Sequence, residues 1–175
     1  MTTETNTPNS WDRINLGSDQ LTSFFIRHLD RIYAAKLHLV EKLPALGEEA
    51  QFGELKNAIA ETVSDVERQL TRIQLIYTLL DRSVERASIF GVSGLIEDAY
   101  DGIARQRGDQ KLQDLSIIFY LQNIESMEMA SFQMLLMAAA QIGHPHVNKL
   151  LKENYDEAKS DRTLLLLLTS KYIVN

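Results

Sequence analysis

The sequence predicts an all-α protein built around four long amphipathic helices, and three observations lead to this fold class. Apolar residues recur at alternating steps of three and four over four long stretches. The chain holds only 3 prolines and 8 glycines in 175 residues, so few helix breakers interrupt those stretches. Its composition, 45% apolar and 24% charged, is that of an ordinary globular protein. We expect a single domain over residues 18–175 and a flexible arm over residues 1–17, which are rich in Thr and Asn.

The first predicted helix follows the arm directly. Ser18 or Asp19 can cap it, because a short polar side chain accepts hydrogen bonds from the free N–H groups of a first turn. Its apolar stripe runs over residues 21–43 and is interrupted by one charged residue, Lys36. We expect this helix to end within residues 44–47, which contain a proline and a glycine.

The second predicted helix begins within residues 48–54, after a tight turn, and runs to about residue 81. Thr62, Asp65 and Gln69 lie on the flank of its apolar stripe. Their spacing of three and four places the side chains along one edge of the helix.

The third predicted helix, residues 112–142, carries two carboxylates on its apolar stripe. Glu125 and Glu128 lie in its middle, where such a stripe faces a core. An ionised carboxylate withdrawn from water is costly unless a cation, a metal or hydrogen bonds compensate it. The sequence therefore predicts a compensating group opposite these two residues.

The fourth predicted helix runs from Pro145 to about residue 172. Gly143 suits the C-cap of the preceding helix, and proline suits the first position of the next one. Glu157 and Asp161 again place polar groups in the middle of an apolar stripe.

Residues 82–108 connect the second and third helices. This stretch contains four glycines and one short predicted helix, residues 95–105. It is too long for a tight turn, so it can carry the chain from one end of a bundle to the other. A four-helix bundle with one long crossover is the connectivity of ferritin-like folds, which is the fold we predict.

Polar residues near the middle of all four helices are expected to meet at one level of the bundle. This predicted polar layer consists of Lys36, Asp65, Gln69, Glu125, Glu128, Glu157 and Asp161. Ferritin-like di-metal centres combine two Glu residues with two Glu-x-x-His motifs at such a level. The oxygen donors are present here, but we expect the imidazoles to lie on helix surfaces or in a turn. The histidines are His28, His38, His144 and His146.

Two interpretations of the polar layer stay open. In the first, the Lys36 ammonium supplies the positive charge that a metal would otherwise bring, and no cofactor binds. In the second, manganese or iron binds to four carboxylates, since such hard ions accept oxygen ligands. Those carboxylates are Asp65, Glu125, Glu128 and Glu157. Lys36 could also extend its methylenes along the helix and reach solvent.

Several segments, in their order and spacing, resemble the YciE/YciF-type family of bacterial ferritin-like stress proteins. They are LDRIYAAK at 29–36, LPAL at 43–46, ELK at 54–56, GLIED at 94–98, IESME at 124–128 and GH at 143–144. The resemblance covers about residues 21–172. It implies a ferritin-like domain, often dimeric, that is linked to the stress response and has a suspected metal site but no established reaction.

The chain departs from the family pattern where the chemistry would lie. Lys36 stands where the family usually has Glu, and Ser126 stands where a His is common. In the second helix, the positions that usually offer His and Glu hold Thr62, Asp65 and Gln69. Glu125, Glu128 and Glu157 match the pattern. At half of the metal-ligand positions that the resemblance implies, this chain has a residue of another type. This favours a degenerate site held by Lys36.

Composition and the absence of certain motifs argue against several classes of function. The formal net charge of −6 argues against nucleic-acid binding, and no apolar run is long enough to span a membrane. The absence of cysteine excludes thiolate chemistry and fits a cytoplasmic protein. No Walker loop or Gly-x-Ser-x-Gly motif is present. We expect a stress-associated protein without catalysis; the alternative is a metal-binding oxidoreductase or metal sequestration protein.

The resemblance implies a homodimer, and an unidentified protein partner is also possible. Six apolar residues off the strict stripes could cover a partner subunit or widen the core of the bundle itself. They are Phe24, Phe119, Tyr120, Met134, Leu136 and Met137.

Overall fold

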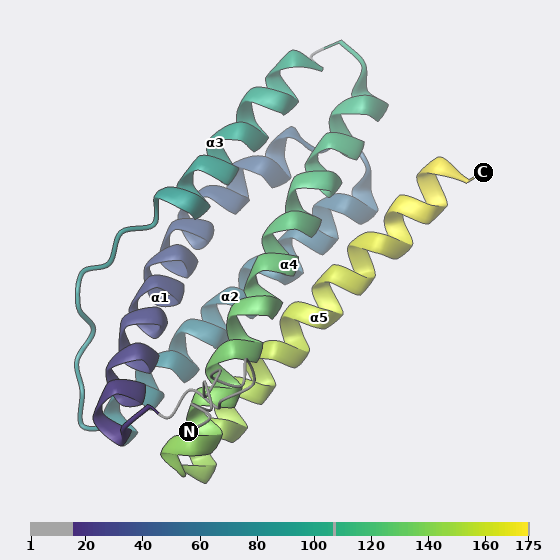
Figure 1. Cartoon of the computed structure of the whole chain (residues 1–175). Coiled ribbons are helices and arrows are strands. Elements are labelled where there is room, and N and C mark those ends of the chain that lie inside the picture. Colours follow the sequence, from purple (N-terminus) through teal and green to yellow (C-terminus); the bar gives the residue numbers. More distant parts are fainter. Residues whose placement is uncertain (1–15, 107, 175) are drawn as a thin grey trace, which may run out of the picture.

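A computed structural model describes residues 16–106 and 108–174, and these residues form helices and loops without a strand (Figure 1). The helices are α1 (Ser18–Glu49), α2 (Gly53–Leu79), α3 (Phe90–Arg105), α4 (Gln110–Ile142) and α5 (Pro145–Ile173). The predicted all-α class is confirmed. The predicted arm, residues 1–17, lies outside the described residues except for its last two positions.

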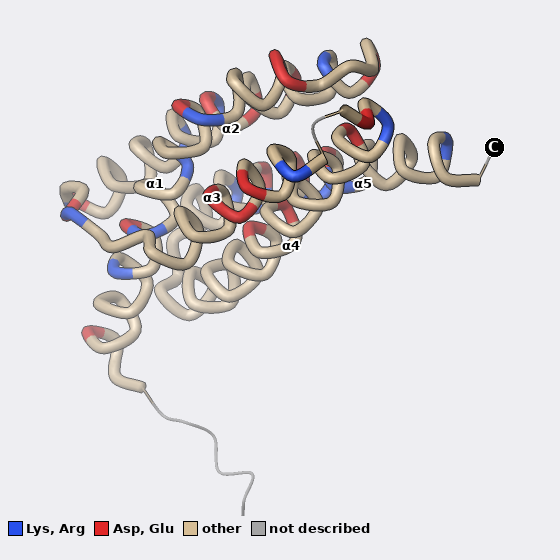
Figure 2. Tube along the Cα trace, turned by 90° about the horizontal axis from the view of Figure 1, so that it is seen from above, with Lys and Arg blue, Asp and Glu red and all other residues tan. Residues whose placement is uncertain are grey.

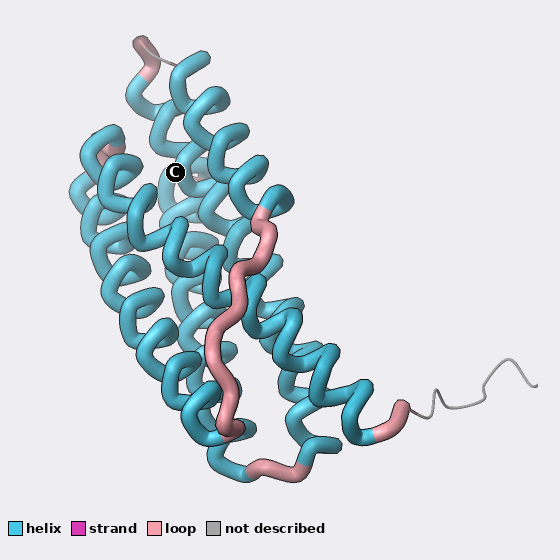
Figure 3. The backbone as a smooth tube through the Cα atoms, turned by 90° about the vertical axis from the view of Figure 1, so that its left-hand side faces the viewer, coloured by secondary structure: helices cyan, strands magenta, loops and turns pink. Residues whose placement is uncertain are grey.

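The long helices α1, α2, α4 and α5 pack in a closed order. α1 contacts α2 and α4, and α5 contacts the same two helices, while α3 packs on α4 and α1. Figure 1 shows that α2 and α4 run in the same direction, so the chain must return between them along the length of the molecule. The loop 80–89 makes the first part of this return, as the long pink segment in Figure 3, and α3 makes the second part.

Polar residues divide the apolar core into two clusters. One cluster draws on the second half of α1 and the first half of α4 and includes Leu39 and Leu121. The other draws on the opposite halves of these helices and includes Phe25 and Phe132. Lys36 lies between the two clusters in α1, and Glu125 and Glu128 lie between them in α4. Buried polar residues therefore occupy the middle level of the molecule.

The end of α1 differs from the prediction. The helix passes through Pro44 and ends at Glu49, although a proline inside a helix removes one backbone hydrogen bond and costs about 3 kcal/mol. Leu43, Leu46 and Ala50 are only 2%, 1% and 0% exposed. Burial of these side chains on both sides of the proline offsets its cost and keeps the chain helical.

The boundary between α4 and α5 follows local sequence signals, whereas α1 begins after Gly17 and not after a capping Ser18 or Asp19. Gly143 is the C-cap of α4 with φ 79°, and Pro145 begins α5, as predicted. The short helix of the connection begins at Phe90, five residues before the predicted start at residue 95. Among the helices that the structure describes, none is long and apolar enough to cross a membrane.

Candidate functional site

Lys36 lies at the centre of the polar layer with a side chain that is 0% exposed. α1 points it inward because it lies on the same face as Ile32 and Leu39. Its Nζ donates hydrogen bonds to Glu128 Oε2, at 2.7 Å, and to Gln69 Oε1. The ammonium also lies 5.2 Å from the centre of the Phe132 ring. One carboxylate, one amide oxygen and one aromatic face thus compensate the buried charge.

Gln69 extends this network toward α5. Its side chain accepts from Lys36, and its backbone carbonyl accepts from Asn154 Nδ2 at 3.4 Å. Asn154 is 0% exposed, and its Oδ1 accepts from Arg72 Nη1 at 3.2 Å. The Lys36 ammonium is therefore connected through two uncharged residues, Gln69 and Asn154, to the guanidinium of Arg72.

Glu125 and Asp161 are buried carboxylates on the same level, 2% and 4% exposed. Glu125 Oε2 and Asp161 Oδ2 have no hydrogen-bond partner among the described residues. Burial, followed by the negative charge of Glu128, raises the pKa of Glu125 well above its ordinary value, although Lys36 opposes the shift. Burial and the charges of Glu61, Glu128 and Glu157 raise the pKa of Asp161 to about 7.

Asp65 and Glu157 face arginines rather than Lys36. Asp65 is paired with Arg68 one turn further along α2. Glu157 accepts from Arg72 Nη1 at 2.6 Å and Arg72 Nη2 at 2.8 Å. Burial alone would raise the pKa of Glu157, but the hydrogen bonds and charge of Arg72 and the charge of Arg68 hold it below its ordinary value. Glu157 is therefore ionised at neutral pH, and both carboxylates are already paired with arginines.

The polar layer thus consists of two groups with different chemistry. The inner group joins Lys36, Gln69 and Glu128, with Glu125 and Asp161 within electrostatic reach. The outer group joins Asp65 and Glu157 to guanidinium groups. Sequence reasoning missed Arg68 and Arg72, and it placed Asn154 on the apolar stripe of the last helix without assigning it to the polar layer. Arg68 follows Asp65 by three residues, which is a spacing at which helical side chains meet, and this signal could have identified it.

The histidines lie outside these hydrogen bonds. His144 is the N-cap of α5, and its Nδ1 accepts from the backbone N–H of Val147 at 3.4 Å. His28 and His38 are half-buried in α1, and His146 is exposed. No imidazole among the described residues donates to or accepts from a member of the polar layer.

The donor set of the polar layer fits a metal poorly as it stands. The Lys36 ammonium is paired with the carboxylate of Glu128. Guanidinium groups are paired with the carboxylates of Asp65 and Glu157. Within residues 16–106 and 108–174, no three His, Cys, Asp or Glu side chains come together in a group that could hold an ion. A metal at this level would have to displace Lys36, because the two cations would compete for the same oxygens.

Comparisons with other proteins agree with this fold. A family described as "Domain of unknown function (DUF892)" matches residues 20–173. The protein YciF of Escherichia coli (strain K12) is 28% identical over 137 residues, which are 78% of this chain and 82% of YciF. The crystal structure of the E. coli stress protein YciF matches with a TM-score of 0.84 and 25% identity, covering 89% of this chain and 98% of that one.

A second solved structure shares the fold. YcfI from Rhodopseudomonas palustris matches with a TM-score of 0.79 and 22% identity, over 89% of this chain and 96% of its own. The resemblance to YciF-type proteins that the sequence motifs predicted is confirmed. Because the family match extends from residue 20 to residue 173, the chain belongs to the DUF892 family.

Proposed function

We propose that this protein is a ferritin-like, stress-associated protein without catalysis, in which an internal salt-bridge layer replaces the central metal site. The observation that carries the proposal is the fully buried Lys36 ammonium bonded to Glu128 and Gln69. A lysine at this place supplies one positive charge without redox chemistry. Its role is then to hold the helices together around a charged centre.

The ferritin-like part of the proposal is supported by the connectivity. Long helices that run in the same direction, α2 and α4, require a return connection, which the loop 80–89 and α3 provide (Figure 1). One long crossover of this kind is a feature of ferritin-like folds. The stress association is supported by the similarity to YciF, which is described as a stress protein.

The test is the metal content of the purified protein. We expect iron or manganese well below one ion per chain after incubation with Fe²⁺ or Mn²⁺, desalting and elemental analysis. The variant Lys36→Glu replaces the ammonium with a carboxylate and should take up more metal. Lys42→Glu, a matched change on a more exposed lysine of α1, should take up no more than the original chain.

A variant without either charge keeps this test informative if Lys36→Glu does not fold. Lys36→Met retains the length of the side chain and removes its charge, so the oxygens of Glu128 and Gln69 lose their donor. Near-stoichiometric metal in the original chain would refute the proposal. So would unchanged stability together with unchanged metal uptake in both Lys36 variants.

The second candidate is a metal-binding oxidoreductase or metal sequestration protein. It is favoured by the two buried oxygens without partners, Glu125 Oε2 and Asp161 Oδ2. With Lys36 displaced, these atoms and Glu128 would offer oxygen ligands to manganese or iron. Asp65 and Glu157 could join only after release from Arg68 and Arg72.

We also propose that two copies of the chain associate through the outer face of α4. Phe119, Met134 and Met137 are 62%, 55% and 68% exposed, and their spacing places them on one side of the helix. Phe24 and Leu136 instead pack against the core, and the Tyr120 ring lies over Gly102. The exposed three would bury apolar surface in a dimer.

A further inference from the structure

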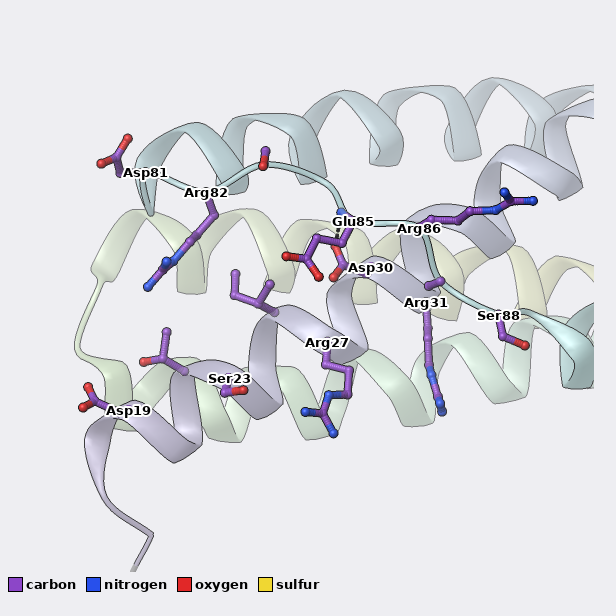
Figure 4. A pocket seen from close by; sticks show the side chains of 14 residues that line it. Asp19, Ser23, Arg27, Asp30, Arg31, Asp81, Arg82, Glu85, Arg86 and Ser88 are labelled. Atoms are coloured by element: carbon purple, nitrogen blue, oxygen red, sulfur yellow. Dashed lines mark hydrogen bonds between the residues drawn. The ribbon is translucent and has the colours of Figure 1, made fainter.

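A groove with a volume of about 970 Å³ lies between the first half of α1 and the loop 80–89 (Figure 4). This volume is at the upper end of the range for small-molecule sites. Two arginines of α1, Arg27 and Arg31, and two of the loop, Arg82 and Arg86, line it. We call it the arginine groove. It lies outside the polar layer.

The four arginines share a property that sets them apart. Among the described residues, none of their guanidinium groups has a hydrogen-bond or ion-pair partner. The arginines that the structure describes elsewhere all donate to a side chain, and they are Arg68, Arg72, Arg105 and Arg162. Figure 2 shows Lys and Arg interspersed with Asp and Glu over several helices.

Positive charge accumulates at one edge of the arginine groove. Arg27 and Arg31 are one helical turn apart and extend from the same side of α1 (Figure 4). Like charges at this spacing repel each other. Partial burial, followed by the charges of Arg31 and Arg27, lowers the pKa of His28 on the same helix. A bound anion would relieve this repulsion.

The wall opposite α1 is held in place by a buried carboxylate. Asp30 is 5% exposed, and its Oδ1 accepts from the Tyr77 hydroxyl at 2.5 Å and from the backbone N–H of Glu85 at 3.2 Å. Burial and the hydrogen bond to Asp30 raise the pKa of Tyr77, so the hydroxyl remains a donor. The loop is thereby attached to α1 and α2, and the groove is shaped before any ligand binds.

Acidic residues also line the groove, but they lie away from the Arg27 and Arg31 edge. In Figure 4, Glu85 lies beside Asp30 between the loop and α1, and Asp19 and Asp81 lie at one end. Neither Arg27 nor Arg31 forms an ion pair with any of them. The arginine edge is therefore available to an external anion.

We propose that the arginine groove binds an extended small-molecule oxyanion with two or more phosphate groups. Arg27 and Arg31 would hold one group, and Arg82 from the loop would hold another. A guanidinium presents two parallel N–H donors that match the oxygens of a phosphate. A single orthophosphate would fill little of this volume, which is why the ligand is extended.

The test is a titration of the full chain with sodium tripolyphosphate and, separately, with adenosine triphosphate, followed by calorimetry. We expect saturable binding of at least one of them, and their order of affinity assigns the ligand as an inorganic chain or a nucleotide. The variants Arg27→Gln/Arg31→Gln and Arg82→Gln/Arg86→Gln should each weaken binding about tenfold or more, because charge-assisted contacts are lost. The matched control is Arg105→Gln, which removes an exposed arginine outside the groove and should bind like the original chain.

A second readout comes from His28. Binding of the anion should raise the pKa of His28, measured by NMR, because it neutralises the charges of Arg31 and Arg27 that lower it. Two results would overturn the proposal. One is no saturable binding of either compound at millimolar concentration, and the other is equal weakening by Arg105→Gln and by the groove variants.

Discussion

Lys36 Nζ and Glu128 Oε2 lie 2.7 Å apart, with side chains that are 0% and 7% exposed. This ion pair connects α1 to α4 between the two apolar clusters of the core. Two charges withdrawn from water stabilise a fold only while each has its partner. The pair therefore makes the stability of this protein sensitive to changes at either residue.

Removal of the ammonium should be strongly destabilising. In Lys36→Met the Glu128 carboxylate stays buried without a cation, and we expect a loss of about 3–5 kcal/mol in the free energy of unfolding. Urea denaturation followed by circular dichroism measures this loss in the free energy of unfolding. The double variant Lys36→Met/Glu128→Leu should recover most of the loss, because neither charge remains. A loss below about 1 kcal/mol in the single variant would place the pair among weak surface pairs instead.

Stability should depend on pH through Asp161. Its pKa is about 7 in the folded chain, against an ordinary value of 3.8. Between these values the folded state retains a proton that the unfolded state releases, so stability falls as pH rises. Relative to Asp161→Asn, the original chain should lose a few kcal/mol between about pH 4 and pH 8, since one pKa unit is worth about 1.4 kcal/mol. Parallel pH profiles of the two proteins would contradict this assignment.

Asp114 should contribute to the start of α2. This α4 residue is 0% exposed, and its carboxylate accepts from Gln51 N at 2.8 Å and from Phe52 N at 2.6 Å. Phe52 itself provides no side-chain cap. Asp114→Ala should therefore cost about 2–3 kcal/mol, because two backbone N–H groups before α2 lose a buried, charged acceptor. The comparison is Asp109→Ala at the exposed start of α4, for which urea denaturation should give only about 1 kcal/mol. Equal losses in the free energy of unfolding for the two variants would show that the contact of Asp114 with the start of α2 adds no more stability than an ordinary exposed cap.

The dimer proposed for α4 is tested by light scattering on a sizing column. We expect the original chain to have the mass of two copies and Met134→Glu/Met137→Glu the mass of one, because buried glutamates would lack partners. Leu75→Glu changes a residue of α2 that is 47% exposed and should leave the mass unchanged. A monomeric original chain, or a dimeric double variant, would refute this surface.

Periodicity predicted the helices well, because apolar spacing and caps are local properties. Gly143 and Pro145 marked a boundary that the structure reproduces. Pro44 misled the prediction, since the burial of Leu46 and Ala50 is a tertiary effect that outweighs the lost hydrogen bond. The early start of α3 at Phe90 likewise followed no strong local signal.

The level of the polar residues could be predicted from the sequence, but their pairing could not. Helical spacing placed Glu157 near the middle of its helix, and only the packing of α2 on α5 brings Arg72 to it. The packing of α1 on α2 decides that Gln69 reaches Lys36. Which carboxylate pairs with which cation depends on how neighbouring helices are rotated and shifted against one another. The apolar periodicity of each helix does not reveal these two quantities.

The most direct test of the central claim is a crystal structure grown with added manganese or iron, with anomalous diffraction recorded at the absorption edge of the metal. We predict that the Lys36 ammonium remains within hydrogen-bond distance of Glu128 and that no anomalous peak lies among Glu125, Glu128 and Asp161. A strong peak among these carboxylates, with Lys36 turned away, would contradict the salt-bridge layer and favour a metal-binding protein.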